Sequence, residues 1–170
     1  MQTIDNIVFD DFLYPHARHL ALLLYHMEGT HIAIPLPNAH LMSFIRVFRN
    51  TSDCQNHIVT NNEQDITLYV YEDNMGWLIM NSYLNNIPQL RRISIFCSTP
   101  EEQKYWATHT RRYRERIEEP FLYNDLDFEL LYFGIRYIRQ VLEQLPNNNA
   151  MRQSLQQNHR NMCQALQHYI

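Results

Sequence analysis

The chain has 170 residues, of which 45% are hydrophobic and 19% charged, a composition that excludes a disordered segment. Its net charge of −4 argues against the broad basic surface of a nucleic-acid-binding protein. At this length we expect one α/β domain over residues 1–146, followed by a short Asn-rich linker and a C-terminal amphipathic helix over residues 147–170.

The first fifty residues leave the opening strand of this domain undecided. Residues 7–9 (IVF) form a short apolar segment, after which Pro15 to Met27 is predicted to be a helix that stops at Gly29. Residues 31–36 (HIAIPL) are the other candidate strand, although Pro35 and Pro37 favour an edge position for it. Either segment is compatible with the first strand of a sheet.

From residue 45 onward, predicted strands and helices alternate. We predict strands at 45–48, 66–71, 93–96 and 121–123, and helices that begin near Cys54, Gly76, Pro100 and Asn124 or Asp125. The helix at Pro100 is predicted to reach about Ile117, with Thr99 as its N-cap or, one residue earlier, Ser98. Because the strands are unbroken apolar runs, the fold class is α/β with a mostly parallel sheet of about five strands. Such a three-layer, flavodoxin-like or receiver-like fold would carry the C-terminal helix as an addition.

Ligands of open α/β sheets bind at the carboxyl ends of the strands, near the point where the strand order reverses. The polar residues expected at this edge form a candidate crevice of Asp10, Asp11, Glu72, Asp73, Ser98, Thr99 and Asn124. Strand-end acids and a hydroxyl make up most of a response-regulator receiver, where carboxylates hold Mg²⁺ and an aspartate accepts a phosphoryl group. The lysine of that chemistry is missing after the last strand, because the only lysine is Lys104. We therefore expect a degenerate crevice without metal or cofactor.

Other groups that carry chemistry elsewhere lack their partners in this sequence. Cys97 ends a predicted strand, and the phosphatase loop that needs an arginine six residues later has Gln103 there. The helical spacing of His16, His19 and His26 lacks carboxylates or cysteines at metal-ligand distance along the chain. The arginine run of residues 111–116 has glutamates interleaved, which favours a solvated helix face over an RNA or phosphate site.

Location and partners follow from what the ends of the chain carry. The N-terminal stretch is acidic, and the longest apolar run, Leu20 to Tyr25, is far shorter than a membrane span. We therefore expect a cytoplasmic protein with reduced cysteines and no membrane contact. Residues 150–169 place Met151, Leu155, Met162, Leu166 and Tyr169 on one side of a helix. That stripe either packs on its own domain, which is the simpler interpretation, or docks a protein partner, or self-associates in a coiled coil.

Four segments resemble a domain of rotifer multidomain proteins: FRNTSDCQNHI (48–58), ITLYVYEDNMGWLI (66–79), IPQLRRISIFC (87–97) and KYWA (104–107). In those proteins the domain precedes a mono-ADP-ribosyltransferase domain or tetratricopeptide repeats of kinesin-light-chain type. The resemblance covers about residues 44–110, leaves residues 10–43 unmatched, and implies a receiver-like or TIR-like α/β module at the front of larger proteins. The E-x-E signature of the transferase is absent from this sequence, so that activity is not implied here.

Two functions of different classes are compatible with these patterns. The favoured one is a non-catalytic interaction or regulatory module, with a degenerate receiver-like crevice and an unknown protein partner. The alternative is a TIR-like enzyme that cleaves the glycosidic bond of NAD⁺ with Glu72, or with Asp73 in its place. The enzyme needs that carboxylate in an open cleft beside Asp10 or Asp11.

Overall fold

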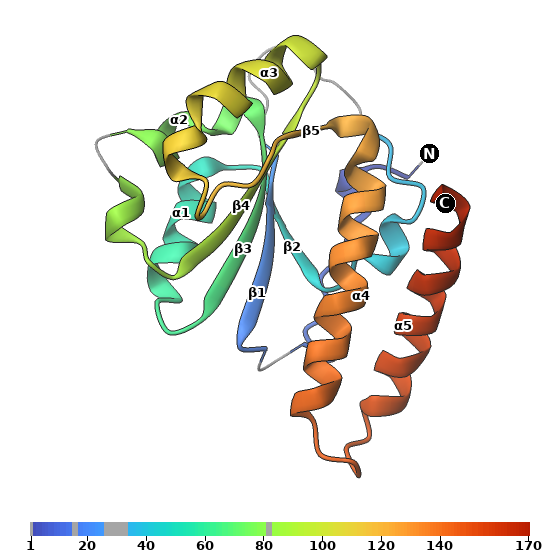
Figure 1. Cartoon of the computed structure of the whole chain (residues 1–170). Helices are drawn as coiled ribbons and strands as arrows, with labels where there is room; N and C mark the ends of the chain where they lie inside the picture. Colours follow the sequence, from blue (N-terminus) through green and yellow to red (C-terminus); the bar gives the residue numbers. More distant parts are fainter. Residues whose placement is uncertain (1, 15–16, 26–33, 81–82) are drawn as a thin grey trace.

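The computed structural model describes residues 2–14, 17–25, 34–80 and 83–170 and has one parallel sheet at its centre (Figure 1). Its five strands pair in the order β2-β1-β3-β4-β5, every pairing being parallel. The strands are β1 (His19–Leu24), β2 (Ile45–Phe48), β3 (Asp65–Tyr71), β4 (Leu90–Cys97) and β5 (Phe121–Leu122). This is the strand order of flavodoxin-like folds, so the predicted α/β class is confirmed.

Helices cover both faces of the sheet and complete three layers (Figure 1). One face carries α1 (Thr51–Thr60), α2 (Gly76–Ile79) and α3 (Pro100–His109), and the other carries α4 (Leu126–Gln144) and α5 (Arg152–Leu166). The predicted C-terminal helix is therefore present, as α5. Among the described residues, no helix is long and apolar enough to span a membrane.

The helices that follow β2 and β4 begin where side-chain caps replace missing backbone partners. Asn50 accepts hydrogen bonds from the backbone N–H groups of Ser52 and Asp53 at the start of α1, at 2.8 and 3.2 Å. Thr99 accepts one from the Glu102 N–H at 3.2 Å, and Pro100 occupies the first helical position of α3. The cap predicted at Thr99 is confirmed.

The first strand is neither of the two predicted segments. Residues 7–9 form no strand, and Val8 is 75% exposed. Of residues 31–36 only 34–36 are described, and Pro35 forms an isolated bridge with Thr3. Instead β1 occupies His19–Leu24, inside the segment predicted to be a helix, whose residues 15, 16, 26 and 27 lie outside the described ranges, as does Gly29. Residues 21–24 are buried on both faces of the sheet, and such a continuous apolar run does not distinguish a strand from a helix.

Two predicted helices are also shorter in the structure. The helix from Pro100 ends at His109, where Thr110 leaves the helical conformation with φ −107° and ψ 5°, and a 3₁₀ turn, η5 (Arg111–Tyr113), follows. The arginine run therefore does not lie on a helix face. The helix expected from Gly76 is the single turn α2, followed by the 3₁₀ turn η4 (Tyr83–Asn86), with residues 81–82 outside the described ranges.

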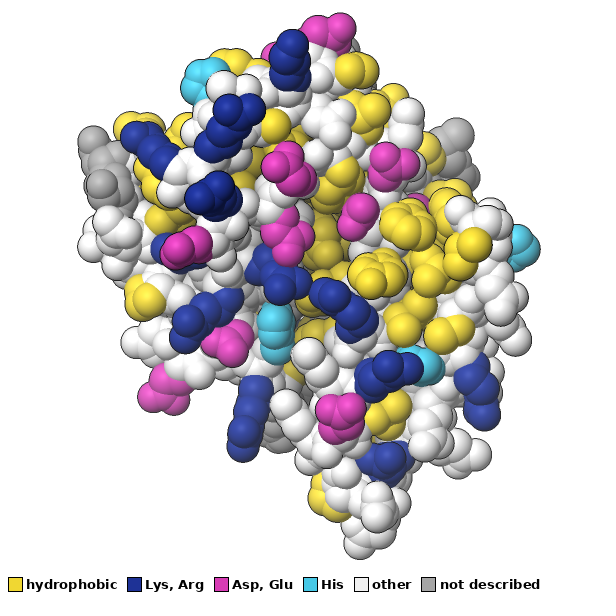
Figure 2. Space-filling model, viewed as in Figure 1, with side chains coloured by type: hydrophobic (Ala, Val, Ile, Leu, Met, Phe, Trp, Pro, Cys, Tyr) yellow, Lys and Arg dark blue, Asp and Glu magenta, His cyan; other side chains and the backbone are white. Residues whose placement is uncertain are grey.

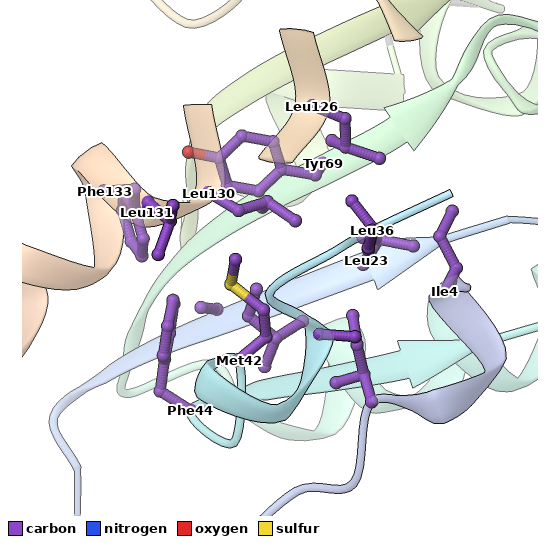
Figure 3. Close-up of a cluster of buried hydrophobic side chains, with 14 of the residues drawn as sticks. Ile4, Leu23, Leu36, Met42, Phe44, Tyr69, Leu126, Leu130, Leu131 and Phe133 are labelled. Atoms are coloured by element: carbon purple, nitrogen blue, oxygen red, sulfur yellow. The ribbon is translucent and has the colours of Figure 1, made fainter. Parts of the chain in front are cut away.

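The core has an aromatic half and an aliphatic half, separated by the sheet. The half beneath α4 contains Phe44, Tyr69 and Phe133, whose rings lie between α4 and the sheet in Figure 3. A Cβ atom at Gly134 would lie 2.7 Å from the Phe44 ring, so a glycine is needed for α4 to approach so closely. The half beneath α1 and α2 is built mainly from leucine, isoleucine and valine. The aromatic half fixes α4 against the strands, which matters for the cavity described below.

Helix α5 belongs to the same packed unit. Its residues Leu155, Met162 and Ala165 are buried in the aromatic half of the core, and α5 packs along α4. This contact uses the centre of the apolar stripe that sequence patterns assign either to the domain or to a partner. The interpretation that α5 packs on its own domain therefore has direct structural support.

Candidate crevice at the carboxyl edge of the sheet

The strand order places the topological switch point between β1 and β3. The chain leaves β1 toward β2 on one side, whereas β3 connects to β4 on the other side. Ligand sites of open α/β sheets form at the carboxyl ends of two such strands. Glu72 follows β3 directly, as the first residue of the 3₁₀ turn η3 (Glu72–Asn74). Glu72 therefore lies at the carboxyl end of β3, beside the switch point.

Glu72 is bonded to the residue that follows the next strand of the sheet. The Ser98 hydroxyl, just beyond β4, donates to Oε1 of Glu72 at 2.6 Å. The Glu72 side chain is 6% exposed, so this donor offsets part of the cost of burying a carboxylate. Its second oxygen, Oε2, is buried and has no hydrogen-bond partner among the described residues. The pair thus has one satisfied and one unsatisfied acceptor.

The side chains flanking Glu72 and Ser98 hold their protons at neutral pH. Burial raises the pKa of the Tyr71 hydroxyl to about 12, and the carboxylates of Glu72 and Asp73 act in the same direction. Burial likewise raises the pKa of the Cys97 thiol to about 12, with Glu72 adding to the shift. A protonated, fully buried thiol is a poor nucleophile. Cys97 acts here as a small core residue.

Three further residues of the predicted crevice lie along the same edge but do other things. Thr99 caps α3, and Asp73 is exposed beside Glu72. Asn124 is exposed in the 3₁₀ turn η6 (Tyr123–Asp125) that follows β5. Asp125, the alternative to Asn124 as the cap of α4, occupies the N-cap position without a side-chain hydrogen bond. In the described contacts, Glu72 has no hydrogen bond with Asp73, Thr99 or Asn124.

Asp10 and Asp11 lie at the opposite edge of the sheet. The Asp10 N–H donates to the Ser43 carbonyl at 2.9 Å, just before β2 begins, and Asp11 pairs with Arg46 at 3.0 Å. Oδ1 of Asp10 accepts hydrogen bonds from the backbone N–H groups of the second and third residues after it. Because residues 7–9 are not a strand, the acids after them do not reach the carboxyl edge. The acidic pair and Glu72 therefore do not form one cluster.

The arrangement limits what the crevice does chemically. A receiver-type Mg²⁺ site needs several carboxylates together. Among the described residues, no group of three His, Cys, Asp or Glu side chains is placed to hold a metal ion.

Comparisons of the chain with protein-family models, with curated proteins and with solved structures find no match. The interpretation of this crevice therefore depends on its geometry alone.

Proposed function

We propose that the chain is a non-catalytic regulatory or interaction module with a degenerate receiver-like crevice. The observation that carries this proposal is the 2.6 Å hydrogen bond between Ser98 and the buried carboxylate of Glu72 at the switch point. The Ser98 hydroxyl occupies a lone pair of Oε1, so this oxygen is less available to attack a substrate. The strand-end hydroxyl is thus engaged with one oxygen of the acid, which favours a structural role for the pair over a reactive one.

The same bond couples two loops, which is how such a module would respond to a partner. Glu72 begins the turn that leads from β3 into α2, and Ser98 immediately precedes the cap of α3. A protein partner that takes the partly exposed Ser98 hydroxyl breaks this bond and shifts both loops together. The apolar stripe of α5 is used within the domain, so we assign partner binding to this crevice rather than to the helix at 150–169.

A second candidate function is the TIR-like NAD⁺ glycohydrolase that uses Glu72. What favours it is the buried Oε2 oxygen without a described partner, which resembles a carboxylate held ready for a substrate. What disfavours it is the position of Asp10 and Asp11 at the other edge of the sheet, away from the cleft that the enzyme requires. We therefore keep it as the alternative.

Nicotinamide release separates these two functions. The purified protein is incubated at high concentration with NAD⁺, and nicotinamide is followed by liquid chromatography. The module predicts no release above the rate without protein, for the wild type and for Glu72→Gln alike. Turnover that Glu72→Gln abolishes and the exposed neighbour variant Asp73→Asn retains would overturn the module and establish the enzyme.

The coupling of the two loops needs its own measurement. Ser98→Ala removes the donor, and amide hydrogen exchange should then quicken both in residues 72–76 and in the first turn of α3. Thr108→Ala, an exposed hydroxyl near the end of the same helix, serves as the control and should leave both regions unchanged. Unchanged exchange in the first turn of α3 of Ser98→Ala would refute the regulatory mechanism.

A further inference from the structure

A second site-like feature lies at the amino-terminal edge of the sheet, opposite to the crevice. A cavity of about 480 Å³ opens between the starts of β1, β3 and β4, residues 114–118 and α4. Backbone hydrogen bonds of 2.8 and 2.9 Å between Ile93 and its neighbours Arg116 and Glu118 hold the 114–118 segment beside β4. In Figure 2, which has the view of Figure 1, blue and magenta side chains crowd the middle of the visible face, with a cyan side chain among them.

Positive charge dominates the wall of this cavity. Three carboxylates line it, against five arginines: Arg91, Arg92, Arg114, Arg116 and Arg136. The excess of cations stands out in a chain whose net charge is −4. A concave site lined mainly by one sign of charge concentrates ligands of the opposite sign.

Three of these arginines are engaged by groups of the protein itself. Arg91 pairs with Asp65 at 3.2 Å, and Arg92 pairs with Glu118 at 3.0 Å. The guanidinium of Arg116 donates to backbone carbonyls of the segment between η4 and β4. These contacts hold the wall of the cavity in place.

The other two arginines, Arg114 and Arg136, form no ion pair among the described residues. Arg136 is held over the ring of Tyr132, 5.2 Å from its centroid, and both arginines are exposed. They come from different elements, α4 and the segment after η5, and line the same cavity.

The residues of the wall that carry neither a carboxylate nor a guanidinium group are His19, Thr67, Phe133, Tyr137 and Gln140. His19 makes a 2.7 Å hydrogen bond with the Thr67 hydroxyl, and its ring centroid lies 6.0 Å from those of Phe133 and Tyr137. Burial lowers the pKa of His19, so its imidazole is neutral at pH 7. His19 stands edge-on to both rings, at interplanar angles of 61° and 81°, so the wall offers ring edges as well as faces. An aromatic wall beside two exposed guanidinium groups suits a ligand with a ring at one end and anionic oxygens at the other.

We propose that this cavity binds an organic phosphate of mononucleotide size, with Arg114 and Arg136 at the phosphate and the His19, Phe133 and Tyr137 rings beside the base. The planar fork of a guanidinium group matches phosphate oxygens. The volume lies in the range of about 300–1,000 Å³ that is typical of small-ligand sites, too small to enclose a protein segment or a nucleic-acid duplex. The site is independent of the crevice at Glu72.

Calorimetric titration of the purified chain with ADP, adenosine and inorganic pyrophosphate tests the proposal. We expect ADP to bind more tightly than pyrophosphate, and adenosine to give no measurable heat. Arg114→Gln and Arg136→Gln should each weaken ADP binding by about tenfold, as expected for the loss of a charged hydrogen bond. Arg139→Gln, an exposed arginine of the same helix that does not line the cavity, is the matched control and should bind as the wild type does.

Several outcomes would overturn the proposal. They are no ADP binding by the wild type, an equal loss of affinity in Arg139→Gln, or pyrophosphate binding as tightly as ADP. Circular dichroism spectra and melting temperatures of the variants show whether a loss of binding reflects unfolding. Glu72→Gln should retain ADP binding, so failure of this site and failure of the proposed function are distinguishable.

Discussion

The ionisable groups at the two edges of the sheet differ in their exposure to water. At the carboxyl edge Glu72, Tyr71 and Cys97 are withdrawn from water. At the amino edge the paired groups stay largely in solvent, with Arg91 and Asp65 exposed by 68% and 61%. Buried hydrogen bonds contribute to stability and fix loops, whereas exposed ion pairs contribute little and remain open to ligands. The comparison therefore separates an edge whose ionisable groups are buried from an edge whose ion-paired groups stay accessible to solvent.

Arg116 is an exception to this comparison, and its substitution gives the largest expected loss of stability. Arg116 belongs to the amino edge, yet its half-buried guanidinium supplies the donors for the carbonyls of Leu84, Ile87 and Leu90. Arg116→Met leaves these acceptors without their charged donor, and we expect a loss of about 2–3 kcal/mol in the free energy of unfolding. Urea denaturation measures it, with Arg112→Met as the exposed control. If both variants are equally stable, Arg116 is a surface charge like its neighbours.

At the carboxyl edge, Ser98→Ala is the corresponding test. It leaves Oε1 of the buried Glu72 without its donor, and the expected cost is about 1–2 kcal/mol. A double-mutant cycle with Glu72→Leu isolates the pair, because the serine no longer matters once the carboxylate is gone. Thermal and urea unfolding both report the difference. Additive effects of the two substitutions would mean that the hydrogen bond does not stabilise this edge.

Thr99→Ala sharpens the comparison, because Thr99 lies next to Ser98 but serves only the backbone. Its loss removes the N-cap of α3 and should cost about 1 kcal/mol. Thr99→Ser retains the capping oxygen and should be close to the wild type. Hydrogen exchange should show fraying of the first turn of α3, with ADP binding unchanged. A larger effect of Thr99→Ala than of Ser98→Ala would reverse the roles assigned to the two hydroxyls.

Local signals in the sequence are sufficient to place Glu72 and Ser98 at the carboxyl edge of the sheet. Glu72 and Ser98 each follow a clear strand, and parallel strands bring their ends to one edge. The helix caps are equally local, as Thr99 shows. The error at β1 has a different origin, since its burial on both faces removes the alternation that identifies a strand. That one error places Asp10 and Asp11 at the wrong edge.

The cavity at the amino edge is beyond such reasoning. Its arginines come from residues 91–92, 114–116 and 136, and the glutamates interleaved in the arginine run favour a solvated helix face instead. Only the end of α3 at His109, and the parallel bridge between Ile93 and Ile117, bring that run back against β4. The excess of arginine over lysine in the chain is the one sequence signal that points toward bidentate anion recognition.

The smallest expected effect on stability is also the sharpest test of what the amino edge is for. Arg91→Gln removes a largely exposed ion pair with Asp65, and the cost should be below about 1 kcal/mol and fall further in high salt. The same substitution removes a positive charge from the cavity, so ADP binding should weaken measurably at low salt. Titration of this variant should therefore show a clear loss of affinity, whereas urea denaturation should show almost no loss of stability. A variant that loses stability but keeps its ADP affinity would show that the edge is structural, and the division between the two edges would fail.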